Sequence, residues 1–261
     1  MRCWYREKTY KCGDYKEVYV YPVYAETTKG GARRRKAKPT CEAQAKLNKR
    51  ISENNLIRLL NANFTKKDIA FDLTYKKGKE PTDKKQAEKD VANFLRRLKR
   101  YRKKQGLSEL KYIGVIERGV KSGRYHHHLV ISGGVDINTL ATMWGKGYTK
   151  AQPLQFDETG LIGKGKYLVK QSLSFRSFNA SRNLVRPQPT SRDGRISQKK
   201  AFDMCMDIYN KEVFEKMYEG YALAEAKSFY NEVNGGIYLE IRLYQKDAAF
   251  LGRKMAKKRR K

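Results

Sequence analysis

The sequence has no long apolar run, few acidic residues beside its many basic ones, and only three histidines. A helix that spans a membrane needs about 20 mostly apolar residues, and the first residues, "MRCWYREK", are too polar for a secretory signal peptide. We therefore expect a cytoplasmic protein with no membrane partner. The four cysteines form no C-x-x-C pair, which favours reduced structural thiols over a zinc site.

The shortage of acidic residues leaves a large positive charge. Lysine and arginine number 58 against 27 for aspartate and glutamate, so the net charge is +31. Such an excess opposes compaction unless a polyanion is close. Nucleic acid is therefore the expected partner, and an anionic membrane surface is the alternative. Apolar residues make up 39% of the chain, which is enough for a folded core.

Apolar periodicity predicts both strands and helices along the chain. We expect strands at 69–75, 111–117, 125–132 and 236–244, and helices at 42–60, 83–105 and 202–217. The segment "EVYVYPVY" also alternates like a strand, and Pro22 assigns it to a sheet edge or an arm.

The expected domain boundaries follow from composition and turn residues. They give a basic N-terminal arm and helix (1–60), a central domain (61–190), C-terminal helices and a strand packed on that same domain (191–247), and a basic tail (248–261). The boundary near 190 rests on the prolines and turn residues of "VRPQPTSRDGR".

The three histidines are adjacent, in "GRYHHHLVIS". Because side chains alternate along a strand, His126 and His128 share one face and His127 lies on the other. Two imidazoles so spaced can bind one cation. Glu117 can add an oxygen ligand if the strand register places it opposite His126 or His128. This set suits Mg²⁺ or Mn²⁺ acting as a Lewis acid, and the alternative is a structural role for the histidines.

The segment "KGKYLVKQ" places Tyr167 and Lys170 on one face of a helix. A tyrosine hydroxyl is a poor nucleophile unless a cation favours the phenolate or a metal polarises the phosphate that it attacks. The alternative is an ordinary tyrosine, because the chain has 18 of them. The overlapping "GLIGKGK" matches the P-loop pattern except at its last place, where Tyr167 stands instead of Ser or Thr.

Taken in chain order, these segments resemble the motifs of HUH endonucleases. The motifs are a hydrophobic strand, here "FDLTY" (71–75), then histidine-hydrophobe-histidine, here "HHH" (126–128), then Y-x-x-K, here "YLVK" (167–170). The resemblance is to the single-tyrosine rolling-circle replication initiators of small phages and plasmids, and it covers roughly residues 60–190. His127 departs from the family pattern, which has a hydrophobic residue at that place.

The resemblance implies an α+β fold, with a central antiparallel sheet flanked by helices around a ferredoxin- or RRM-like core. It implies that His126, His128 and Glu117 hold Mg²⁺ or Mn²⁺ against a phosphate of single-stranded origin DNA in a bacterial host cell. Tyr167 would attack that phosphate to form a 5′-phosphotyrosine, and Lys170 would position the reacting groups or balance their charge. The freed 3′-hydroxyl would serve a host polymerase, and a host helicase would unwind the duplex.

Basic residues around the tyrosine are the expected DNA contacts. The segment "FRSFNASRNLVRPQP" resembles the basic segment of phage-type members, and its aromatics can stack on bases. The candidates are Lys166, Arg176, Arg182 and Arg186.

Two other functions remain open at this point. A non-enzymatic, basic nucleic-acid-binding protein explains the charge but not the order of the motifs. A relaxase or transposase of the same superfamily shares the chemistry, although relaxases more often carry the tyrosine near the N-terminus.

Overall fold

The computed structural model describes residues 3–25, 42–119, 122–157, 159–171, 178–232 and 234–246. The chain divides into two compact units. Unit 1 comprises Met1–Pro39, Glu158–Gly160 and Pro187–Lys261, and unit 2 comprises Thr40–Asp157 and Leu161–Arg186. Among the described residues, no helix combines the length and the apolar character that crossing a membrane requires.

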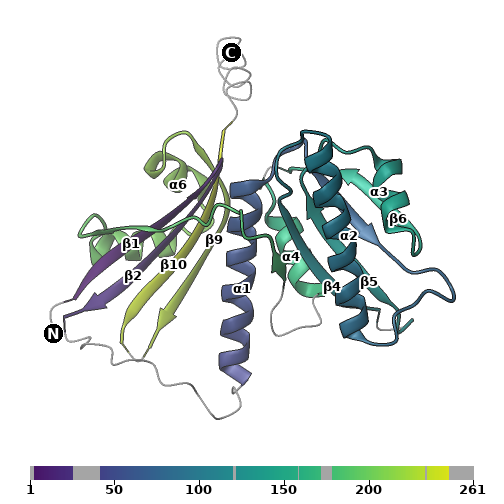
Figure 1. Ribbon diagram of the computed structural model, residues 1–261. Coiled ribbons are helices and arrows are strands. Elements are labelled where there is room, and N and C mark those ends of the chain that lie inside the picture. Colours follow the sequence, from purple (N-terminus) through teal and green to yellow (C-terminus); the bar gives the residue numbers. More distant parts are fainter. Residues whose placement is uncertain are drawn as a thin grey trace, which may run out of the picture. The chain divides into compact units, whose positions relative to one another are not determined.

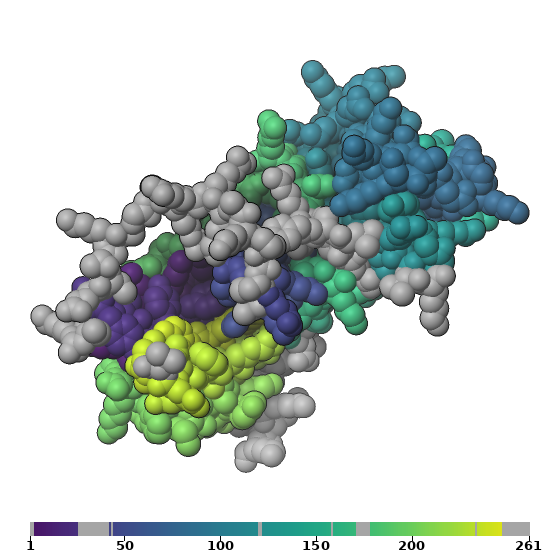
Figure 2. Space-filling model, turned by 90° about the horizontal axis from the view of Figure 1, so that it is seen from below, coloured from purple at the N-terminus to yellow at the C-terminus, as the bar shows by residue number. Residues whose placement is uncertain are grey.

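Unit 1 is built around a five-stranded antiparallel sheet in the order β8-β1-β2-β10-β9. Its elements are β1 (Cys3–Cys12), β2 (Tyr15–Tyr24), β8 (Thr190–Asp193), α5 (Gln198–Met206), α6 (Lys211–Met217), β9 (Tyr221–Asn231) and β10 (Gly236–Gln245). The N-terminal strands, purple in Figures 1 and 2, therefore lie beside the C-terminal strands, yellow in the same views. Apolar side chains of α5 and α6 cover one face of this sheet.

Pro22 does not place β2 at the edge of the sheet, as the sequence pattern had predicted. β2 is the middle strand, paired with β1 on one side and β10 on the other. The ladder with β10 covers only Tyr15–Val20. Pro22 lies beyond it, where the N–H that proline lacks is not needed for pairing.

Unit 2 contains the second five-stranded antiparallel sheet, in the order β6-β3-β5-β4-β7. Its elements are α1 (Glu42–Asn63), β3 (Ile69–Leu73), α2 (Lys84–Lys104), β4 (Tyr112–Arg118), β5 (Tyr125–Ile131), α3 (Ile137–Trp144), β6 (Thr149–Pro153), α4 (Ile162–Gln171) and β7 (Asn179–Ala180). The predicted α+β class, with helices flanking antiparallel strands, is confirmed.

The helices cover the two faces of the unit 2 sheet with separate cores (Figure 1). On one face, α2 and α3 pack on Phe71, Leu73 and Leu129. On the other, α1 and α4 pack on Ile113, Val115 and Val130. Strand alternation assigns neighbouring residues of β5 to different cores, so this strand alone brings side chains into both.

The compact units run across the domain boundaries expected from the sequence. The helix expected in the arm, α1, belongs to unit 2, and the C-terminal strands form a sheet of their own with β1 and β2. The single helix expected at 202–217 is two helices, α5 and α6, with Asn210 capping the second. The basic segment 31–39 and the tail 248–261 lie outside the described residues.

Candidate active site

The β4–β5 hairpin sets the register on which the predicted site depends. Glu117 lies opposite His126, and His128 lies between Val115 on β4 and Asp72 on β3. The sequence left open whether Glu117 shares the face of His126 and His128, and the register confirms that it does.

His128 is bridged by two carboxylates. Its Nδ1 lies 2.8 Å from Asp72 Oδ1, and its Nε2 lies 2.7 Å from Glu117 Oε2. Burial opposes protonation of the ring, but the hydrogen bonds and charges of Asp72 and Glu117 outweigh it, so the pKa of His128 is raised. Burial works against a charged Asp72 as well, yet its hydrogen bond with His128 brings its pKa below the ordinary value.

The donor set fits a small divalent cation in part. Two ligands at right angles on Mg²⁺, each at about 2.1 Å, are about 3 Å apart, which is close to the separation of His128 Nε2 from Glu117 Oε2. Asp72 on the other ring nitrogen matches the carboxylate–histidine–metal arrangement. His126 does not join them, because no group of three or more His, Cys, Asp or Glu side chains is placed to hold a metal among the residues that the structure describes.

Helix α4 carries Tyr167 over this cluster. The rings of Tyr167 and His128 meet edge to face with their centroids 5.6 Å apart. Tyr167 remains 43% exposed, so its ring contacts the buried histidine while much of the side chain is open to solvent. An aromatic hydroxyl held beside a histidine and two carboxylates is the arrangement that a tyrosine nucleophile needs.

Lys164, about one helical turn before the tyrosine, supplies a cation beside its ring. Its Nζ lies 5.4 Å from the centroid of the Tyr167 ring. Burial lowers the pKa of Lys164, while the charge of Asp72 acts in the opposite direction. Lys170, the lysine that the motif singled out, is exposed near the end of α4.

Gly165 explains why this helix contains glycines. A Cβ at Gly165 would lie 2.5 Å from Cγ1 of Ile57, a fully buried residue of α1. Only glycine allows the two helices to approach so closely. The "GLIGKGK" segment is thus largely helical, rather than a phosphate-binding loop, and its glycine brings α4 close to α1.

His127 lies on the opposite face, as strand alternation predicted. It is fully buried, its Nε2 is 2.8 Å from the Tyr75 hydroxyl, and its ring meets the Trp144 ring edge to face. Burial lowers the pKa of His127 to about 4. It is therefore neutral at neutral pH and separated by the sheet from Tyr167.

The predicted DNA-binding residues are only partly described. Arg182 and Arg186 are exposed in the segment after β7, and Lys166 is half-buried on α4. Arg176 lies outside the described residues.

Two residues of the cluster were missed by the sequence reasoning. Asp72 is a charged residue in an otherwise apolar strand, "IAFDL", and that interruption was the available signal. Lys164 precedes Tyr167 by three residues, the same helical spacing that drew attention to Lys170. Spacing alone cannot decide between the two lysines, since each shares a helix face with the tyrosine.

Comparison with known proteins bears on this same region. Residues 68–172 match a family model of replication-associated proteins, the ORF2 type. No curated protein and no solved structure gave a significant match. The matched segment contains all the residues of the cluster, from Asp72 to Tyr167. It supports a replication initiator of this family.

Proposed function

We propose that this protein nicks and rejoins single-stranded DNA at a replication origin through a covalent phosphotyrosine at Tyr167. The observation that carries the proposal is the placement of a part-exposed Tyr167 against His128, whose two ring nitrogens are held by Asp72 and Glu117. The family match supports the replication role, and the charge of +31 suits a DNA substrate.

The covalent step exchanges one phosphate ester for another. The Tyr167 oxygen bonds to phosphorus and loses its proton to solvent, while the 3′-oxygen of the preceding nucleotide leaves and takes up a proton. Lys164 favours the phenolate by its charge. The ester energy stays in the phosphotyrosine, so attack by a 3′-hydroxyl reverses the step without a nucleotide cofactor.

Glu117, His128 and His126 are the residues that would hold a divalent metal. A bound Mg²⁺ or Mn²⁺ would supply Lewis-acid polarisation of the scissile phosphate. Asp72 orients His128 through its Nδ1. His126 shares the sheet face with both ligands, and a change of its side-chain rotamer is the rearrangement that binding requires.

The decisive experiment is a covalent-adduct assay. Wild-type protein, an origin-containing single strand and Mn²⁺ should give a protein–DNA band that survives denaturation. Tyr167→Phe should form no adduct and still bind the strand. Tyr148→Phe is the matched control, because Tyr148 is a 79% exposed tyrosine of the same unit. An adduct in Tyr167→Phe would show that another residue is the nucleophile.

A non-enzymatic DNA-binding protein is the second candidate. The observation in its favour is that His128 is already engaged by both carboxylates, as a structural ion pair would be. It predicts salt-sensitive binding with no cleavage in Mn²⁺ or Mg²⁺. The enzyme predicts cleavage that EDTA abolishes and Mn²⁺ restores.

A further inference from the structure

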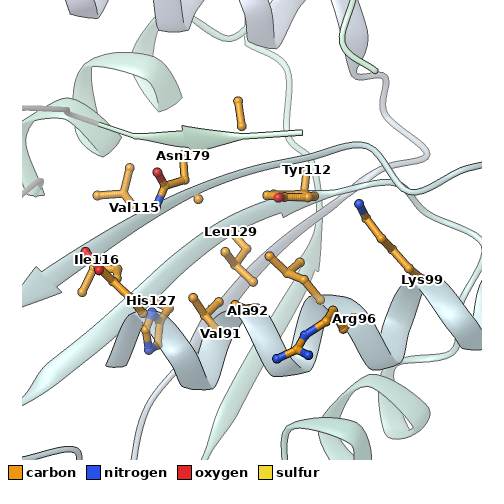
Figure 3. A pocket seen from close by; sticks show the side chains of 14 residues that line it. Val91, Ala92, Arg96, Lys99, Tyr112, Val115, Ile116, His127, Leu129 and Asn179 are labelled. Atoms are coloured by element: carbon orange, nitrogen blue, oxygen red, sulfur yellow. The ribbon is translucent and has the colours of Figure 1, made fainter. Parts of the chain in front are cut away.

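A cavity of about 360 Å³ lies on the face of the unit 2 sheet opposite Tyr167. It is bounded by α2 and by the strands β4, β5 and β7 (Figure 3). This volume is within the range of small-molecule sites. The buried side chains of Val91, Leu95 and Leu129 make part of its wall apolar, and nothing in the proposed cleavage reaction uses it.

A buried polar group lines one end of this cavity. His127 is 0% exposed, and its Nδ1 has no hydrogen-bond partner in the described part of the chain, while its Nε2 is taken by Tyr75. A buried nitrogen without a partner is costly, and such groups call for an explanation. A ligand with a hydrogen-bonding edge provides one.

The other end carries an aromatic ring and two cations. Tyr112 is half-buried on β4, and Lys99 Nζ lies 5.7 Å from its ring centroid. Arg96 is exposed about one turn earlier on α2, and Figure 3 shows both cations on the side of the cavity away from His127. Glu88 also lines the cavity, and its carboxylate is 3.8 Å from Lys84.

We propose that this cavity binds a single nucleotide, with the base between the apolar walls and the phosphate at Arg96 and Lys99. A base has flat apolar faces and a hydrogen-bonding edge that can reach His127. A phosphate alone would leave the apolar wall unused, and an aliphatic group would leave the histidine nitrogen unpaired. The nucleotide could be free in solution or part of a single strand, since the two present the same chemistry.

Ala92 offers a clean test, because it lines the cavity but is exposed on α2. Equilibrium dialysis of the full chain with labelled deoxyadenosine monophosphate should show saturable binding. Ala92→Leu fills the space and should weaken binding roughly tenfold, whereas Ala92→Ser, the matched control, should not. Lys99→Glu should weaken it about tenfold as well, and Arg100→Glu, an exposed α2 residue outside the cavity, should have little effect.

A photoreactive base in a short single strand identifies the source. Cross-linking to Tyr112 that Ala92→Leu abolishes would assign the site to a nucleotide of the strand, and mononucleotide binding without such cross-linking would assign it to a free nucleotide. Equal mononucleotide affinity for wild type and Ala92→Leu, or no saturable binding, would overturn the proposal. Binding of indole but not of the nucleotide would overturn it as well. Both measurements are independent of Tyr167, so loss of cleavage does not affect them.

Discussion

The two faces of β5 carry neighbouring histidines in opposite environments. His128 faces α4 between Asp72 and Glu117, and its pKa is raised. His127 faces α2 and α3, packs against Trp144, and burial lowers its pKa to about 4. Residues of one type, joined by one peptide bond, therefore differ in charge at mildly acidic pH. The comparison teaches that the side of the sheet, rather than the run of three histidines, decides which one can act.

The largest expected effect separates the two faces by activity. His128→Gln should lower the single-turnover rate of Mn²⁺-dependent cleavage by at least about 100-fold, since it removes a group of the ligand cluster. His127→Gln, the matched control, should keep the rate within about threefold. Rates of adduct formation at saturating DNA measure both. Equal losses in the two variants would break the distinction between the faces.

The pH dependence of stability should separate the faces next. Unfolded His127 gains a proton near its reference pKa of about 6.5, while folded His127 resists until about pH 4. The unfolded state then binds more protons, so stability falls as the pH drops through this window, by on the order of 3 kcal/mol. Urea unfolding of metal-free protein should show that His127→Gln removes this loss.

His128 should give the opposite sign. Its raised pKa makes its contribution fully present below about pH 6.5, and this contribution disappears as the pH rises through the folded value. Comparing His128→Gln with wild type at about pH 5 and about pH 8 should show the larger loss of stability at the lower pH. A larger loss at the higher pH would contradict the ion-pair assignment.

A smaller effect concerns the hydrogen bond between His127 and Tyr75. His127→Leu removes one partner and leaves a buried hydroxyl unpaired, at a cost of about 1–3 kcal/mol in the free energy of unfolding. Adding Tyr75→Phe should recover part of that loss, so the double-mutant cycle should be non-additive. Cleavage should persist in His127→Leu. Strict additivity would mean that the two groups do not interact.

The smallest expected effect distinguishes the lysines of α4. Lys164→Met should lower the cleavage rate about tenfold, because it removes a charge-assisted contribution beside Tyr167. Lys170→Met should have less effect, because Lys170 is exposed. Lys89→Met on α2, which is also exposed and on the other face, is the control. A larger loss for Lys170→Met would restore the role that the Y-x-x-K motif gives it.

Local patterns predicted much of the site's framework. The apolar stripe of α2, its cap at Asp83 and its end before Gly106 lie where the sequence placed them. The strands that carry Glu117 and His128 do too. These features depend on residues within one helical turn or one strand pair, so short-range spacing was sufficient.

Unit 1 shows where local patterns were insufficient. The strands β1 and β9 were not anticipated, and β2 pairs with β10, which is more than 200 residues away in the chain. Each strand alone buries too little surface to announce its partner, because a sheet is stabilised by cross-strand pairs. The same limitation hid Asp72, whose role appears only when β3 lies beside β5.

The sequence by itself determined the alternation that separates His127 from its neighbours, the helix that carries Tyr167 and the positive charge that calls for a polyanion. Only the tertiary structure decided the rest. It chose the register that puts Glu117 opposite His126, placed Asp72 on His128, and brought α4 close to α1 at Gly165. The physical reason is that alternation and helical periodicity are properties of one segment, whereas register and helix approach depend on the fit between segments far apart in the chain.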